Sequence, residues 1–120
     1  MSSPALRLLA LAVAVLGVVL AAVLLREEPL PYVVTAIDYH FHDAHPTFPI
    51  GPGRDLVVKN VGRNLHNVTI PALDISTDVP PGGELTVEDI AARLGSGSFE
   101  LMCRYHEDRG MTGVIVTIDG

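Results

Sequence analysis

The distribution of apolar residues divides the chain into two unlike parts. From Leu8 to Leu25, 18 consecutive residues carry no charged or strongly polar side chain. From Tyr32 onward, apolar and polar residues alternate with a period of two, which is typical of strands with one buried face. At about 1.5 Å per residue, the first segment forms a helix about 27 Å long, close to the ~30 Å hydrocarbon core of a bilayer. The pattern predicts a single N-terminal transmembrane helix followed by a small β-rich domain.

The charges at the two ends of this helix predict its orientation. Arg7 and the N-terminus precede the apolar segment, whereas Arg26 follows it and is offset by Glu27 and Glu28. The positive-inside rule then places the N-terminus in the cytoplasm and the remaining chain outside the cell membrane. A cleaved signal peptide, which would release a secreted domain, is the alternative. We favour an uncleaved single-pass anchor, because Leu20-Ala21-Ala22 is a poor cleavage site with apolar residues continuing beyond it, and no lipid-acceptor cysteine follows.

We expect three parts along the chain: an anchor of signal-anchor type at 1–26, a short tether at 27–31 and one domain at 32–120. Within the domain, the alternation predicts one long first strand in which Val33 and Phe41 share a face. Further strands are expected at 56–59, 65–70, 84–87, 98–103 and 114–118. One short helix is expected at 88–94, with Thr86 and Asp89 as its capping box. Many short strands separated by Gly/Pro turns predict an all-β sandwich or barrel.

Composition excludes several classes of function. Eight basic residues stand against fourteen acidic ones, giving a net charge of −6, so nucleic acid is not an expected partner. A single cysteine excludes an internal disulfide, a CxxC redox pair and a four-cysteine zinc site. The acidic surface and the period-two pattern predict a soluble domain that is a monomer.

The chemistry of the chain is concentrated in one cysteine, two histidines and one methionine. Cys103, His106 and Met111 lie close together in sequence, and the alternation places Cys103 and His66 on the apolar faces of their strands. A lone cysteine outside the cytoplasm is open to oxidation unless it is buried or bound to a metal. Taken alone, His66 is more simply a hydrogen-bonded core histidine, and Cys103 is either an inert core residue or a ligand.

Taken together, these residues predict a copper site. A thiolate, two imidazoles and a weak axial thioether form the trigonal ligand set of electron-transfer copper centres. Sulfur stabilises Cu(I) and nitrogen suits Cu(II), so a fixed intermediate geometry keeps reorganisation small. We expect one copper ion held by His66, Cys103, His106 and Met111, with Gly110 letting the backbone turn Met111 towards the metal.

These motifs resemble those of the small blue copper proteins, the cupredoxins of the plastocyanin and azurin type. The matching segments are Asn64-Leu-His-Asn-Val68 and Cys103-x2-His106-x4-Gly110-Met111-x-Gly113. The resemblance covers about residues 32–118 and implies a Greek-key β-sandwich with one type 1 copper ion near one end. It implies His66, Cys103 and His106 as equatorial ligands and Met111 as the axial one.

The resemblance also assigns roles around the ligands. Asn67 matches the residue that ties the two ligand-bearing segments together near the thiolate. His106 matches the ligand nearest the surface, where redox partner proteins dock. The sequence departs from the family at Tyr105, where plastocyanins commonly have proline, and in the charged residues Arg104 and 107–109 that flank His106.

Three functions are compatible with this reading. The first, which we favour, is a membrane-tethered extracytoplasmic carrier of single electrons that cycles between Cu(I) and Cu(II). The second is an extracytoplasmic copper-handling protein that delivers or buffers the metal, and the third is a metal-free interaction module. An enzyme is not expected, because a Cys103–His106 nucleophile pair lacks an orienting group and a cleft. Since residues 29–120 carry six basic and twelve acidic side chains, we expect a redox partner with a basic docking face.

A second histidine cluster stands apart from the copper motif. His40, His42 and His45 form the pattern His-x-His-x2-His at the end of the predicted first strand and in the following turn. They are compatible with a second metal site. They are also compatible with a solvated polar edge, which we favour because no carboxylate or cysteine donor is evident beside them.

Overall fold

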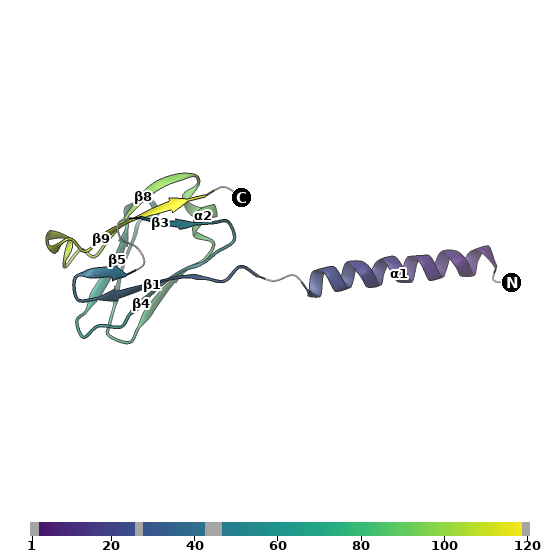
Figure 1. Ribbon diagram of the computed structural model, residues 1–120, viewed down its shortest axis with the longest axis horizontal. Helices are drawn as coiled ribbons and strands as arrows, with labels where there is room; N and C mark the ends of the chain where they lie inside the picture. The colour runs from purple at the N-terminus through teal and green to yellow at the C-terminus, as the bar shows by residue number, and fades with distance from the viewer. Residues whose placement is uncertain (1–2, 26–27, 43–46, 119–120) are drawn as a thin grey trace.

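The computed structural model describes residues 3–25, 28–42 and 47–118, and within them it forms a helix joined to a two-sheet sandwich (Figure 1). The first sheet has the strand order β2-β1-β4-β7 and the second has the order β3-β9-β8-β5-β6. The described strands are β1 (Tyr32–Ile37), β2 (His40–His42), β3 (Thr47–Ile50), β4 (Leu56–Asn60), β5 (His66–Ile70), β6 (Ile75–Val79), β7 (Glu84–Val87), β8 (Gly97–Met102) and β9 (Thr112–Thr117). The β1–β4 and β3–β9 pairs are parallel and the others are antiparallel. The predicted all-β sandwich is confirmed.

The long first strand expected from the sequence is in fact a hairpin. Asp38, in the left-handed region with φ 52°, turns the chain between β1 and β2. Because the turn changes the alternation, Val34 is buried in β1 and Phe41 is buried in β2. The expected sharing of one face by Val33 and Phe41 is therefore wrong, and Val33 is exposed.

Two strands and the helix cap also differ from the prediction. β3 and β6 were not expected, because β3 contains Pro49 and β6 carries mostly polar, exposed residues. The short helix is α2 (Ile90–Leu94), and Thr86 lies in β7. The predicted capping box is absent: Asp89 is itself the N-cap residue of α2 without a side-chain cap hydrogen bond, and its carboxylate accepts a hydrogen bond from the Gly53 N–H at 3.2 Å instead.

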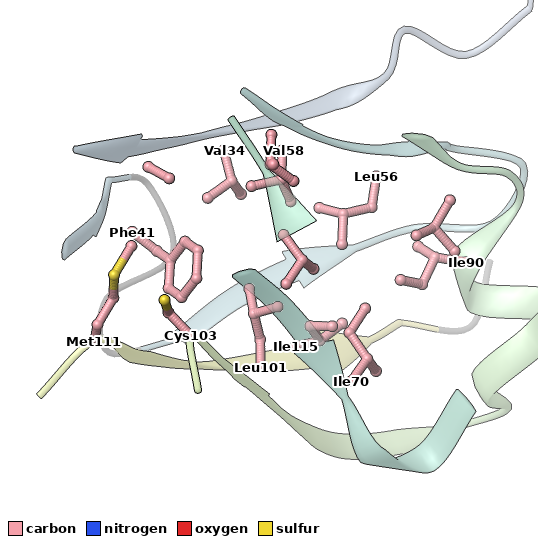
Figure 2. Close-up of a cluster of buried hydrophobic side chains, with 14 of the residues drawn as sticks. Val34, Phe41, Leu56, Val58, Ile70, Ile90, Leu101, Cys103, Met111 and Ile115 are labelled. Atoms are coloured by element: carbon pink, nitrogen blue, oxygen red, sulfur yellow. The ribbon is translucent and has the colours of Figure 1, made fainter. Parts of the chain in front are cut away.

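The core lies between the two sheets and its members come from both of them. Val34 and Val58 of the first sheet face Leu101 and Ile115 of the second, and all four are fully buried (Figure 2). Removal of such side chains from water is the main favourable term in the folding of a small domain. Cys103 belongs to the same buried cluster, so the core holds the thiol in place.

The N-terminal helix α1 (Pro4–Leu24) projects away from the sandwich (Figure 1). Ser3 caps it by accepting a hydrogen bond from the Leu6 N–H at 3.2 Å, and Pro4 occupies its first turn. None of its residues is buried. By length and composition, this helix is able to cross a membrane.

Candidate metal centre

The first histidine of the predicted site is held at the start of β5. His66 is fully buried and pairs across the sheet with Val79 of β6. The loop that leads to it is pinned by Asn60, whose side-chain amide donates to the carbonyls of Asn64 and Val79, both at 2.8 Å. The Asn60 side chain also accepts from the Gly62 N–H at 3.0 Å. The position of His66 is thus set by the protein frame.

The other predicted ligands lie on the tight loop between β8 and β9, at the end of the sandwich away from α1 (Figure 1). The loop is closed by a hydrogen bond from the Cys103 N–H to the Met111 carbonyl at 3.0 Å. Inside it, the His106 N–H donates to the Cys103 carbonyl at 3.0 Å and the Met111 N–H donates to the His106 carbonyl at 3.1 Å. Gly110, expected to let the backbone turn Met111 back, adopts φ 84° in the left-handed region.

These elements bring three donor side chains to one point. The ligating atoms of His66, Cys103 and His106 all lie within 4.8 Å of one another. The Cys103 Sγ is 3.5 Å from His106 Nδ1, and the ring centroids of the two histidines are 5.3 Å apart. Met111 is fully buried and lies with Cys103 beside Phe41 at one end of the core (Figure 2). All four predicted residues therefore lie at the same end of the sandwich.

The state of His66 indicates a missing partner. Neither of its ring nitrogens, both buried, has a hydrogen-bond partner among the described residues. Buried polar atoms in proteins are nearly always paired, and an orphan pair costs free energy. A metal ion would give one of these two nitrogens its partner.

The electrostatics of His66 favour the form that binds metals. Burial lowers the pKa of this imidazole, the nearby His106 lowers it further, and Asp38 partly opposes the shift. A lowered pKa keeps the ring neutral and its nitrogen lone pair available to a metal. The donor set and its protonation therefore fit a soft or borderline transition metal.

Asn67 contacts both the thiol and the neighbouring hairpin strand. Its backbone N–H donates to Cys103 Sγ at 3.3 Å, as expected from the resemblance. Its side-chain amide donates to Asp78 at 3.0 Å, and the same carboxylate accepts from the Tyr105 hydroxyl at 2.8 Å. Arg104 completes the group by donating to the Tyr105 oxygen at 3.0 Å. These contacts join β5 and β6 to the loop that carries the cysteine.

One further residue borders the half-buried His106, and the sequence did not single it out for this position. The ring of Tyr39, from the β1–β2 turn, contacts the His106 ring edge-on at a centroid distance of 5.1 Å. The guanidinium of Arg109 lies over the Tyr39 ring at 4.6 Å. Tyr39 reaches this end of the molecule because of the β1–β2 turn, which was not predicted. The sequence around Tyr39 therefore does not predict its contact with His106.

The second histidine cluster is separate from this site. His40 and His42 lie on β2 with both side chains exposed, and His45 falls outside the described residues. The three residues that converge on one point do not include them.

A two-sheet sandwich with buried cysteine, histidine and methionine side chains at one end defines a class, the blue copper proteins. The family model "Cupredoxin-like domain" matches residues 8–117. The chain belongs to this family, and copper is the cofactor that the family and the donor set define.

Solved structures of cupredoxins share the fold at low sequence identity. The oxidised plastocyanin of Dryopteris crassirhizoma is 11% identical with a TM-score of 0.60, and the match covers 72% of this chain and 100% of the plastocyanin. Amicyanin from Paracoccus versutus is 17% identical with a TM-score of 0.57, over 73% of this chain and 81% of amicyanin. An amicyanin variant in its reduced Cu(I) form is 16% identical with a TM-score of 0.57, over 73% and 82% of the two chains. No curated protein sequence matches this chain.

Proposed function

We propose that the protein is a membrane-tethered, extracytoplasmic carrier of single electrons without a catalytic role. The observation that carries this proposal is the convergence of one thiol and two imidazoles within 4.8 Å, with both His66 nitrogens left without partners. Structural neighbours captured as oxidised plastocyanin and as Cu(I) amicyanin support a role in electron transfer.

The four predicted ligands would bind copper with different strengths. His66, Cys103 and His106 would hold the ion with two imidazoles and one thiolate, and Met111 would supply a weaker thioether sulfur. When bound, copper supplies a one-electron change between Cu(I) and Cu(II). The chain would keep the donors in one arrangement in both states, because the loop hydrogen bonds and the core hold Cys103 and the pairing of β5 with β6 holds His66. Small reorganisation makes electron exchange fast.

His106 is the ligand through which we propose that electrons leave. It is only half-buried, whereas His66, Cys103 and Met111 are fully buried. The loop that precedes His66 exposes Val61 and Leu65, which provide apolar contact surface at the same end.

The partner that fits this protein has a basic docking face. Residues 29–120 carry twelve acidic and six basic side chains, so long-range attraction would steer a cationic surface towards the domain. Cationic small redox complexes should therefore reduce the protein faster than anionic ones, and the difference should shrink as salt screens charges beyond about 10 Å. Stopped-flow rates that are equal for both complexes and flat with ionic strength would rule out this part of the proposal.

The helix α1 would hold the protein at the membrane with its N-terminus in the cytoplasm. Its length and apolar composition suit a span, and Arg7 lies on the side that the positive-inside rule assigns to the cytoplasm. Protease added outside intact cells should digest a C-terminal tag, and the protein should stay with membranes in carbonate washes. Release of a shortened domain into the medium would instead identify α1 as a cleaved signal sequence.

Voltammetry of the copper-loaded full-length protein in nanodiscs tests electron carriage directly. We expect a reversible one-electron wave with fast electron exchange, and Met111→Leu should retain the wave at a higher potential because only a weak axial donor is lost. If a mild chelator removes copper faster than the centre exchanges electrons, the copper-handling alternative replaces our proposal.

A further inference from the structure

The pair His40 and His42 forms a feature that the copper site does not use. Both residues lie on β2, which is the edge strand of the first sheet and pairs only with β1 in the described sheet order. Phe41 between them is buried with 1% of its surface exposed, so the two histidines share the opposite, solvent-exposed face. Residues two apart on a strand point to the same side, and the resulting pair of imidazoles stands together on an accessible edge.

The separation of the two rings suits a shared ion. A metal lies about 2.0–2.1 Å from the nitrogen that binds it, and so about 3.2 Å from the centre of that ring. Two imidazoles on one ion then have ring centres about 4.5 Å apart at a right angle and about 6.4 Å apart on opposite sides. The His40 and His42 centroids are 6.2 Å apart, inside this range, and the rings are inclined at 77°. Exposed side chains are free to rotate, so the two rings are able to move closer together and bind one ion at a right angle to each other.

The chemistry of this pair differs from that of the buried site. It offers two imidazole nitrogens and no thiolate, so water would occupy the remaining coordination positions of a bound ion. Nitrogen and oxygen donors in a square or tetragonal arrangement suit Cu(II), which also heads the Irving–Williams order of affinities. An exposed site without sulfur would exchange its ion with solvent and would lack the intense colour of thiolate-bound copper.

We propose that His40 and His42 form a second site, open to solvent, that binds one Cu(II) ion with water completing its coordination. The proposal goes beyond electron carriage and stands on the geometry of β2 alone. It gives the outer face of the domain a place where Cu(II) is captured reversibly, apart from the ion in the core.

The test uses the full-length protein in nanodiscs with the buried site already loaded with one equivalent of copper. Further Cu(II) should bind in one additional equivalent and add a second electron paramagnetic resonance signal with nitrogen coupling, while the visible band stays constant. The double variant His40→Gln/His42→Gln should lose this equivalent, and either single variant should weaken its binding by roughly tenfold or more because two linked donors act together. Lys59→Gln, an exposed change on β4, which β1 separates from β2, should leave it intact.

Two outcomes would overturn the proposal. One is the absence of a second equivalent in the unaltered protein, and the other is a second equivalent that persists undiminished in the double variant. The visible band reports the buried site in every sample, so failure of the second site is distinguishable from failure of the electron-carrier proposal.

Discussion

At the scale of single residues, Asp78 is the most connected charged side chain near the metal centre. It accepts hydrogen bonds from the Asn67 amide and the Tyr105 hydroxyl, and Arg104 lies 3.8 Å away. The hydrogen bond from Asn67, then that from Tyr105, lowers the pKa of the Asp78 carboxyl. Asp78 thus fastens the loop that carries Cys103 to the β5–β6 hairpin in its ionised form.

The lowered pKa of Asp78 predicts a pH dependence of stability. Because the folded-state pKa lies below the unfolded one, the stabilisation is complete above about pH 4 and disappears as the pH falls through the folded-state value. Asp78→Asn should therefore show a small decrease in Tm at pH 7 that shrinks as the pH falls below about 4. The measurement is the Tm of both copper-free proteins from pH 7 to pH 3. A constant difference across this range would show that Asp78 contributes nothing through its charge.

Residue identity explains why the ligands and Asn67 could be predicted from sequence, whereas their neighbours Asp78 and Tyr39 could not. Cys103, His106 and Met111 are close in the chain, and the alternation of β5 places His66 on the buried side, so the pattern itself carries the information. The contacts of Asp78 and Tyr39 depend on strand pairing between distant segments. Without knowledge of which strands pair, the sequence does not predict these contacts.

Among the elements, the loop between β8 and β9 determines where three of the four predicted ligands lie. Its turns are closed by backbone hydrogen bonds, including one from the Gly110 N–H to the Glu107 carbonyl at 3.0 Å. Gly110, at φ 84°, reverses the chain so that Met111 returns to the core. The conformation of the loop therefore depends on Gly110, because glycine tolerates a left-handed backbone.

Gly110→Ala should destabilise the protein by about 1–2 kcal/mol, because other L-residues are strained in the left-handed region. An added Cβ meets nothing within 4 Å, so backbone strain alone acts at this position. Gly51→Ala is the matched control, since its Cβ is equally free of contacts and its φ lies outside the left-handed region. Denaturant titration of copper-free protein measures both changes, and equal effects of the two variants would contradict the role of Gly110.

Two elements, the turn at Asp38 and the strand β6, were not predicted from the sequence pattern. A continuous period-two pattern through residues 33–41 concealed the turn at Asp38, because a two-residue turn does not interrupt the run of strand-forming residues. β6 was missed because Ser76, Thr77 and Asp78 are exposed at a sheet edge and carry no apolar alternation. Strands with one buried face, such as β5 and β8, were predicted within a few residues.

At the scale of the whole molecule, Arg54 joins the sandwich to the segment that leads to α1. Its Nε donates to the Leu30 carbonyl at 2.7 Å, its Nη2 donates to the Pro31 carbonyl at 3.3 Å, and its guanidinium lies 5.3 Å from the centre of the Tyr32 ring. β1 begins there and runs about 20 Å towards the turn whose Tyr39 contacts His106. The metal centre is therefore held at the end of the domain opposite the tether.

Arg54→Ala should loosen the tether without altering the metal centre. Loss of two hydrogen bonds and a cation–π contact should speed amide exchange in peptides that span residues 28–34, including the Tyr32 N–H that donates to Asp55. Arg63→Ala, which removes an exposed arginine at the other end of the domain, is the control. Unchanged exchange in Arg54→Ala would mean that Arg54 does not restrain the tether.

Visible absorption on addition of Cu(II) shows whether Cys103 binds copper as a thiolate. Cys103 is the chain's only cysteine, so a thiolate-to-Cu(II) charge-transfer band has one possible source. We expect the copper-free protein to develop an intense blue or green colour with one equivalent of Cu(II), and Cys103→Ser to remain colourless under the same conditions. A band that persists in Cys103→Ser, or an unaltered protein that binds Cu(II) without colour, would contradict the account.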